Sequence, residues 1–163
     1  MADQFSETIV ALLPNLRRYA ISLSRSRDAA DDLVQITCEK AFAARTSFDP
    51  ATRLDAWLFR ILRNSWIDMT RRQKTRGTGI DAADAGALLS ADGAAETEDK
   101  LMLRAVFEAI LKLPEEQRDP LMLVCVEEFS YREASELLEI PIGTLMSRLA
   151  RGRIALAKMV GIN

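Results

Sequence analysis

Basic and hydrogen-bonding side chains gather near the end of the sequence, in the stretch IPIGTLMSRLARGRIAL at residues 140–156. Residues 140–163 carry four Arg or Lys and no Asp or Glu, although the whole chain has a net charge of −2. On one face of a helix, guanidinium groups bind phosphates and reach base edges in the DNA major groove. The pattern therefore predicts a DNA-reading helix. The alternative is a solvated basic face that complements the helix dipole.

A helix-turn-helix pattern positions this stretch. Ser130 and Glu133 have the spacing of a capping box at the start of a short helix. A turn over 140–143 leads to a last helix, which we expect Thr144 to cap and which runs to about Val160. On a helical wheel the apolar and polar residues of this last helix separate. The apolar side holds Leu145, Leu149, Gly152 and Leu156, and the polar side holds Ser147, Arg151 and Lys158, flanked by Arg148 and Arg153.

A second candidate surface for nucleic acid lies on the helix predicted from about Leu54 to Arg72. Its apolar side comprises Leu54, Leu58, Ile61, Leu62 and Ser65, and its other side comprises Arg60, Arg63, Asn64 and Arg71, with Trp57 at the border. Arg screens phosphates, aromatic rings stack on bases and an amide reads base edges, so this side suits a single strand. The alternative is that Trp57 and Trp66 are packing residues, which we favour for Trp66.

The composition argues against several kinds of catalytic or metal site. The sequence has no histidine, which excludes His-based triads and most zinc sites. Cys38 and Cys125 have no CxxC spacing, and we expect buried thiols, with a redox or metal sensor as the alternative. No catalytic set of side chains is evident, so we predict no enzyme, no cofactor and no metal. Without a signal-peptide pattern or a long apolar run, the sequence predicts a soluble, cytoplasmic protein.

Helical periodicity dominates the chain, so we predict an all-α fold with two small helical domains. The first domain covers residues 1–75 and the second covers residues 99–163. A flexible linker at 76–98 joins them. Residues 77–99 carry six acidic and no basic side chains and few large apolar ones, which is typical of a mobile segment.

The predicted helices of the first domain span about 6–24, 28–44 and 54–72. Pro14 interrupts the first of them, so an alternative start lies near that proline. In the second domain one helix covers 99–113. Another segment starts at Leu113-Pro114-Glu115-Glu116. The Asp119-Pro120 pair favours the start of the helix proper, because proline suits a first turn and restricts the residue before it. We expect that helix to end at Glu128.

Two blocks of the sequence resemble bacterial RNA polymerase sigma factors. The first block is similar to sigma region 2 and consists of Asp31–Gln35, Phe48–Pro50, Ala56–Asn64, Ile67-Asp68 and Arg71-Arg72. The second block is similar to sigma region 4 and consists of Leu113-Pro114, Phe129–Glu133 and Ile142–Arg151. The order of the blocks, the acidic linker and the lack of a region 3 domain resemble the extracytoplasmic-function (ECF, group IV) subfamily of the sigma-70 family. The resemblance covers nearly all of the chain outside 77–98.

The resemblance implies a set of partners and the residues that bind them. The β′ clamp helices of core RNA polymerase are expected to meet Asp31, Asp32, Leu33 and Gln35, and the β flap is a further expected contact. The −10 promoter element is expected to meet Phe48, Trp57, Arg60, Asn64, Asp68, Arg71 and Arg72. Near Phe48–Thr52, a base of the melted strand is expected to enter a pocket. The −35 duplex is expected to meet Thr144, Ser147, Arg148, Arg151 and Arg153.

The resemblance also implies regulation by an anti-sigma factor that covers these faces. The lack of a long apolar run predicts no membrane insertion by the chain itself. Three positions depart from the family's usual pattern. Glu139 stands where Gly is common, so we expect the helix before the turn to end with another geometry. Ser135 replaces a small Ala, and Met146 replaces a frequent Lys. The Met146 change predicts fewer phosphate contacts or a different −35 sequence.

Two other functions remain open on the sequence. A stand-alone helix-turn-helix repressor predicts tight duplex binding without polymerase and usually a dimer. An all-helical adaptor predicts that the basic faces bind acidic proteins in a salt-sensitive way, without promoter-dependent transcription.

Overall fold

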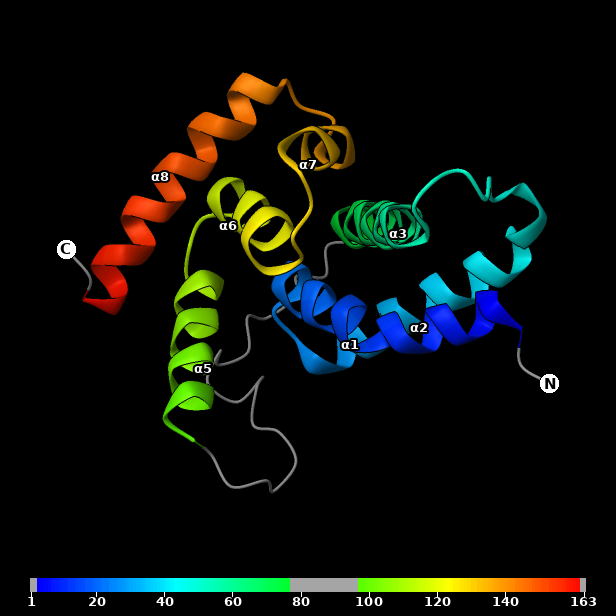
Figure 1. Cartoon of the computed structure of the whole chain (residues 1–163), viewed down its shortest axis with the longest axis horizontal. Coiled ribbons are helices and arrows are strands. Elements are labelled where there is room, and N and C mark those ends of the chain that lie inside the picture. The colour runs from blue at the N-terminus through cyan, green and yellow to red at the C-terminus, as the bar shows by residue number, and fades with distance from the viewer. Residues whose placement is uncertain (1–2, 77–96, 162–163) are drawn as a thin grey trace. The chain divides into compact units, whose positions relative to one another are not determined.

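The computed structural model describes residues 3–76 and 97–161, and within these ranges it contains helices and no strand, which confirms the all-α prediction. The chain divides into two units, Met1–Ala82 and Ala83–Asn163 (Figure 1). Most of the predicted linker lies outside the described residues. None of the helices in these two ranges is both long and apolar enough to span a membrane.

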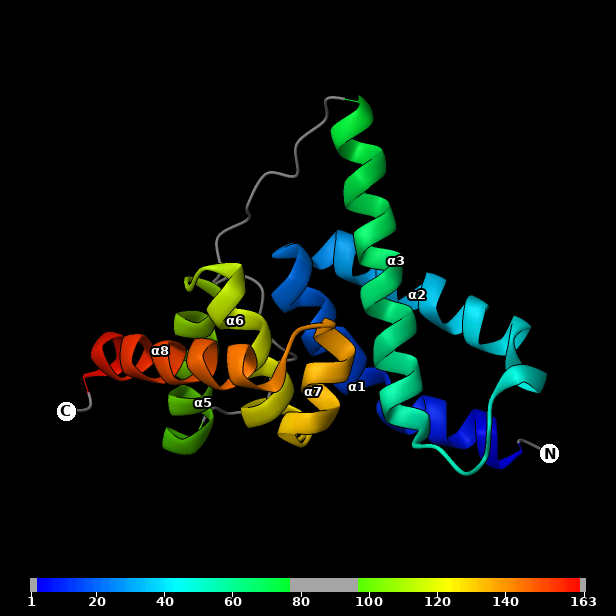
Figure 2. The same cartoon turned by 90° about the horizontal axis from the view of Figure 1, so that it is seen from above.

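Residues 3–76 of unit 1 form a bundle of three helices in which α1 packs on α2 and α3 packs on both (Figure 2). The elements of the unit are α1 (Gln4–Ser24), α2 (Arg27–Ala43), the short 3-10 helix η1 (Arg45–Ser47) and α3 (Leu54–Arg76). Apolar side chains from all three α-helices fill its core, among them Leu16, Tyr19, Leu33, Leu58, Phe59 and Leu62. The rings of Tyr19 and Phe59 stack with centroids 5.2 Å apart, which joins α1 to α3. Packing of this kind between distant residues fixes the buried side of α3, while the opposite side of the helix stays exposed.

The first helix, α1, begins at Gln4, well before the alternative start that the sequence predicted near Pro14. Asp3 caps α1, because its Oδ1 accepts a hydrogen bond of 2.8 Å from the amide of Ser6. Pro14 lies inside the helix, so the alternative start near that proline is wrong. Proline removes the amide that would donate to the carbonyl of Val10, and Val10 is exposed, so water can satisfy that carbonyl.

The described part of unit 2, residues 97–161, contains five helical segments, of which α8 is the longest. These are α5 (Glu98–Leu111), α6 (Glu115–Leu121), the π-helical turn η2 (Met122–Val126), α7 (Tyr131–Leu138) and α8 (Ile142–Val160). Leu113, Leu121 and Leu149 form a buried cluster that joins α6 to α8. The prediction that a helix begins at Asp119-Pro120 is wrong, because α6 begins at Glu115 after Pro114 and contains Pro120. Pro114 therefore occupies the N-cap position, directly before the first turn of α6.

The turn between α7 and α8 follows the predicted pattern with two corrections. The Ser130–Glu133 capping box is present. Glu139 has the left-handed φ of 55°, so the expectation of another geometry at this position is wrong. The amide of Ile140 donates to the Ser135 carbonyl, and the Ser135 hydroxyl donates back to the Ile140 carbonyl at 2.6 Å. These bonds hold a left-handed residue that glycine adopts more easily.

The start of α8 is the second correction. The helix begins at Ile142, directly after Pro141, and no side chain caps it. Thr144 is therefore the third residue of the helix and does not cap it. The Pro141 carbonyl accepts from the amide of Leu145 at 3.0 Å, which is the first intrahelical bond.

Candidate nucleic-acid interface

The two sides of α8 separate as the sequence predicted. Leu145, Leu149 and Gly152 are buried against the rest of unit 2. A Cβ atom on Gly152 would lie 2.9 Å from Leu121 Cδ1, so glycine permits the close contact between α6 and α8. Ser147 and Arg151 are exposed on the other side. Packing of α8 against unit 2 therefore leaves a basic, hydrogen-bonding surface open to solvent.

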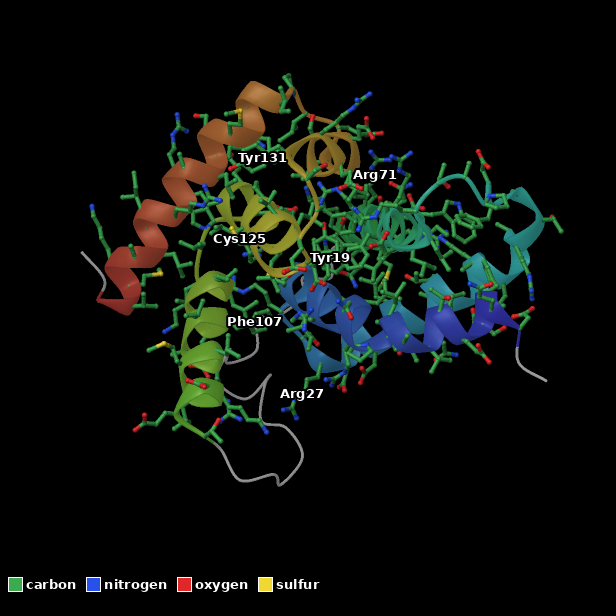
Figure 3. All side chains as sticks on the ribbon, viewed as in Figure 1. Tyr19, Arg27, Arg71, Phe107, Cys125 and Tyr131 are labelled. Atoms are coloured by element: carbon green, nitrogen blue, oxygen red, sulfur yellow. The ribbon has the colours of Figure 1, made fainter. Side chains whose placement is uncertain are left out.

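The remaining predicted residues of α8 lie at the flanks of this surface. Thr144 and Arg148 are half-buried, and Arg153 is exposed. The Arg153 guanidinium turns toward Cys125 Sγ, at 3.8 Å, and toward Tyr131, two residues that Figure 3 labels. Hydrogen bonds to Tyr131 and then to Cys125 raise the pKa of Arg153. In this arrangement Arg153 contacts unit 2 itself, whereas Arg151 extends into solvent.

The exposed face of α3 carries most of the polar residues assigned to it. Arg60, Asn64 and Asp68 follow one another at intervals of four residues and are all exposed. Arg71, labelled in Figure 3, and Arg72 extend this face toward the end of the helix. The neighbouring Ser65 is buried, and its hydroxyl accepts a hydrogen bond of 2.9 Å from Lys40 of α2. One side of α3 is therefore anchored and the other is free.

Arg63 and Trp66 differ from the residues of that exposed face. Arg63 is half-buried, and its Nη1 lies 3.4 Å from the Tyr19 hydroxyl, so its predicted place among the exposed polar side chains is wrong. Its guanidinium joins α3 to α1. Trp66 is half-buried, which agrees with the packing role that we favoured.

The loop between η1 and α3 has a defined turn. Asp49 accepts hydrogen bonds from the Ala51 amide at its side chain and from the Thr52 amide and hydroxyl at its backbone carbonyl, at 2.7 to 2.9 Å. The ring of Phe48 packs on Trp57 at the start of α3, with centroids 5.0 Å apart. Two aromatic residues assigned to one site by the sequence are therefore brought into contact.

The acidic patch on α2 lies at the surface except for its leucine. Asp31, Asp32 and Gln35 are exposed, and Arg17 Nε of α1 pairs with Asp31 Oδ1 at 2.9 Å. Leu33 is fully buried in the core of unit 1. Leu33 was expected to contact polymerase. Its burial makes it a packing residue that supports the patch and not a surface contact.

The two thiols differ in their surroundings. Cys125 is exposed, so the expectation of a buried thiol is wrong for this residue. The π turn in which it lies changes the direction of its side chain relative to a continued α-helix. Cys38 is half-buried, and burial, together with the negative charge of Glu39, raises its pKa.

Known proteins similar to this chain cover both units. The family model described as Sigma-70 region 2 matches residues 8–76, and the model described as Sigma-70, region 4 matches residues 103–156. The ECF RNA polymerase sigma factor EcfG of Rhodopseudomonas palustris is 37% identical over 163 residues, which cover 100% of this chain and 88% of that protein. The chain belongs to the ECF sigma factors of the sigma-70 family.

Another relative and one solved structure agree with this membership. The ECF sigma factor SigW of Bacillus subtilis is 33% identical over 168 residues, covering 97% of this chain and 89% of SigW. The structure of the sigma factor RpoE with the anti-sigma factor NepR from Bartonella quintana matches with a TM-score of 0.80 and 33% identity, over 99% of both chains. Unit 1 of this sigma factor thus contains region 2, and unit 2 contains region 4.

Unit 1 of this sigma factor contains contact residues that the sequence did not reveal. Phe5 at the start of α1 contacts both rings of the Phe48–Trp57 pair, and Phe42 at the end of α2 and Arg45 in η1 contact the Phe5 ring. Phe5 and Arg45 lie 40 residues apart in sequence, so no helical or alternating periodicity links them. The one sequence signal was compositional, since four of the eight Phe and Trp residues fall in this cluster.

Proposed function

We propose that this chain is an ECF-type sigma factor that binds core RNA polymerase and directs promoter-specific transcription initiation. The observation that carries the proposal is the pair of exposed nucleic-acid faces, one on α3 and one on α8, in units that match region 2 and region 4. The chain performs no chemical step of its own. Opening of the strands uses binding energy that the sigma factor and polymerase supply together.

In region 2, the exposed face of α3 and the adjoining loop bind the −10 element. Arg60 and Arg71 screen phosphates of the melted strand, and Asn64 offers an amide to base edges. One base leaves the stack and is held near Phe48, where its extrusion costs a few kcal/mol that pocket contacts offset. This division explains why an amide and aromatic rings accompany the basic side chains.

In region 4, α8 enters the major groove of the −35 duplex. Ser147 and Arg151 lie on its open side, and both residue types bind phosphates or base edges. Met146 is 49% exposed on the same helix, where it offers an apolar group in place of a cation. Apolar side chains contact the methyl group of thymine, so Met146 favours such a contact over a phosphate.

Polymerase and an inhibitor complete the set of proposed partners. Asp31, Asp32 and Gln35 on α2 bind the β′ clamp helices, and unit 2 contacts the β flap. An anti-sigma factor holds the protein inactive, a proposal that the likeness to RpoE, solved with NepR, supports. The assignment of residues 1–75, 76–98 and 99–163 to region 2, linker and region 4 belongs to the same proposal.

Run-off transcription tests the function directly. Core polymerase is combined with and without this chain, and start sites are mapped on promoter DNA. We expect products that depend on the chain and on both promoter elements. Tight duplex binding by a dimer without polymerase, and no promoter-dependent product, would favour the repressor. Salt-sensitive binding to acidic proteins alone would favour the adaptor.

Two single substitutions separate the proposed surfaces. Asn64→Ala should impair recognition and melting of the −10 element, and Arg148→Ala should mainly weaken binding to the −35 duplex. Each loss is expected to be roughly 1–3 kcal/mol, the usual range for a residue that reads bases. Identical loss profiles on promoters altered in either element would contradict this division of labour.

A further inference from the structure

The first turn of α1 reaches three other segments of unit 1 through one aromatic side chain. The Phe5 ring lies 5.8 Å from that of Phe42, 6.2 Å from that of Phe48 and 6.1 Å from that of Trp57, between centroids. These separations, and the edge-on angles to Phe42 and Trp57, are those of favourable aromatic pairs. Phe5 therefore joins the end of α2, the loop and the start of α3.

A charged group fastens the same turn to the segment before the loop. The Asp3 carboxylate uses Oδ1 to cap α1 and Oδ2 to pair with Arg45 Nη2. The Arg45 guanidinium also lies over the Phe5 ring, 4.8 Å from its centroid. A cation at this distance from a ring face is attracted by the ring's electrons. Arg45 begins η1, so this pair of contacts fixes the entry to the loop.

The loop itself is shaped by local bonds. Asp49 bonds to Ala51 and Thr52, and Arg53 bonds to Asp55. Bonds between near neighbours define the shape of a turn but do not anchor it to the rest of the domain. The Phe48 ring supplies that anchor, because it packs against both Phe5 and Trp57.

We propose that Asp3 and Phe5 are positioning residues that hold the loop at Phe48–Thr52 in the geometry required to capture the −10 base. This inference rests on the proposed function, which assigns that loop to the −10 element. A displacement of the order of an ångström strongly weakens a positioned contact. Residues outside the DNA-binding face, such as Asp3 and Phe5, can therefore control base capture. Both residues precede residues 8–76, the part of the chain that matches the region 2 model.

Two substitutions and two controls test the positioning role of Asp3 and Phe5 in the full chain with core polymerase. Asp3→Asn keeps a good cap for α1 but removes the charge that pairs with Arg45. Phe5→Ala removes the ring, and Phe5→Tyr restores it. Val10→Ala changes an exposed apolar residue of the same helix, 63% exposed, and serves as the control.

The readouts distinguish positioning from a general loss of structure. Open-complex formation is measured on a duplex promoter and on one whose −10 bases are already unpaired. Binding to core polymerase and to a −35 duplex is measured beside it. Emission of Trp57, in a Trp66→Phe background, reports the packing of the loop.

We expect Phe5→Ala to lower open-complex formation roughly tenfold on both promoters, from the loss of several ring contacts. Asp3→Asn should lower it about threefold, as an exposed ion pair allows. Both should shift Trp57 emission, Phe5→Tyr should recover activity, and Val10→Ala should match the parent chain. Core and −35 binding should stay unchanged in all four variants.

Other outcomes overturn the inference. Suppose that Phe5→Ala and Asp3→Asn keep full −10 recognition while Phe48→Ala and Asn64→Ala lose it. The positioning role of Asp3 and Phe5 is then refuted, and the proposed function stands. If Phe5→Ala weakens core binding as much as open-complex formation, its effect is a loss of folding and not of positioning. If Phe48→Ala and Asn64→Ala also lose nothing, the proposed function fails, and the inference fails with it.

Discussion

The two proposed nucleic-acid surfaces of this sigma factor differ in how many segments build them. The region 4 surface lies on a single helix, α8, whose opposite side is buried. The region 2 surface combines the face of α3 with a loop that contacts the first turn of α1, which in turn contacts the end of α2. A surface on one rigid helix depends on that helix being docked. A composite surface depends in addition on contacts between distant segments, so more kinds of substitution can disturb it.

The largest expected effect concerns the docking of α8. Gly152→Leu forces a side chain into the space of Leu121 and Gln117, and we expect it to destabilise unit 2 by roughly 2–3 kcal/mol. Both tryptophans lie in unit 1, so their emission follows unit 1 while circular dichroism follows all helices. In urea, a shifted transition should appear by circular dichroism and not by emission.

Gly143→Ala is the matched control for that substitution, because a Cβ atom there meets nothing within 4 Å. It should leave stability unchanged or raise it by up to about 1 kcal/mol. An equal shift of the emission transition in Gly152→Leu would break the comparison, since the two surfaces would then share one cooperative fold.

The next effect concerns the exposed cation of α8. Arg151→Ala should weaken binding to −35 duplex about tenfold, and should reduce the slope of log affinity against log salt by about one, as loss of one phosphate contact predicts. Fluorescence anisotropy over a series of salt concentrations measures both quantities. Lys112→Ala removes the same charge from an exposed position next to α5. Equal losses in the two variants would mean that net charge, and not the α8 surface, determines binding.

A smaller effect concerns the turn before α8. Ser135→Ala removes the 2.6 Å bond to the Ile140 carbonyl and should cost unit 2 about 1 kcal/mol. Glu139→Gly relieves the left-handed backbone and should return about the same amount in the double variant. Urea unfolding followed by circular dichroism measures each step. If Ser135→Ala is neutral, the turn does not depend on that hydroxyl.

The smallest effect concerns the thiols. Cys125 is exposed and Cys38 is half-buried, so Ellman's reagent should react first with Cys125, and Cys125→Ser should remove the fast phase. Burial and Glu39 raise the pKa of Cys38, so its stabilising contribution is fully present below the thiol's unfolded pKa. That contribution is lost as the pH rises toward the folded pKa. Cys38→Ser should therefore make unit 1 less sensitive to alkaline pH; an unchanged alkaline midpoint would contradict this.

The accuracy of the sequence predictions follows the same division between local and distant contacts. The capping box at Ser130 and the two sides of α8 were correct, because both depend on residues within a few positions of each other. The predicted start of α8 was wrong, and for α6 the preferred start at Asp119-Pro120 was wrong, although a segment start at Leu113-Pro114 was also predicted. In the structure α6 begins directly after Pro114, and α8 begins directly after Pro141. For α6, Pro120 was taken as the start although the helix tolerates it in its interior.

Tertiary contacts account for the other differences. Arg63 has the helical position of an exposed residue, but the Tyr19 hydroxyl from another helix is within its reach. Leu33 lies beside exposed aspartates in sequence and is nevertheless buried by its neighbours in the bundle. The Phe5 cluster depends on four segments meeting, and no periodicity encodes such a meeting.

The sequence by itself determined that the chain is helical, that it resembles ECF sigma factors in two blocks and that α8 presents a basic side to solvent. These properties depend on periodicity, capping and residue type, which act over one or two helical turns. Only the tertiary structure decided which side chains of region 2 are free and which are anchored, and that Asp3 and Phe5 contact the segments around the loop. The physical reason is that burial and pairing of a side chain depend on partners that chain folding brings from distant positions.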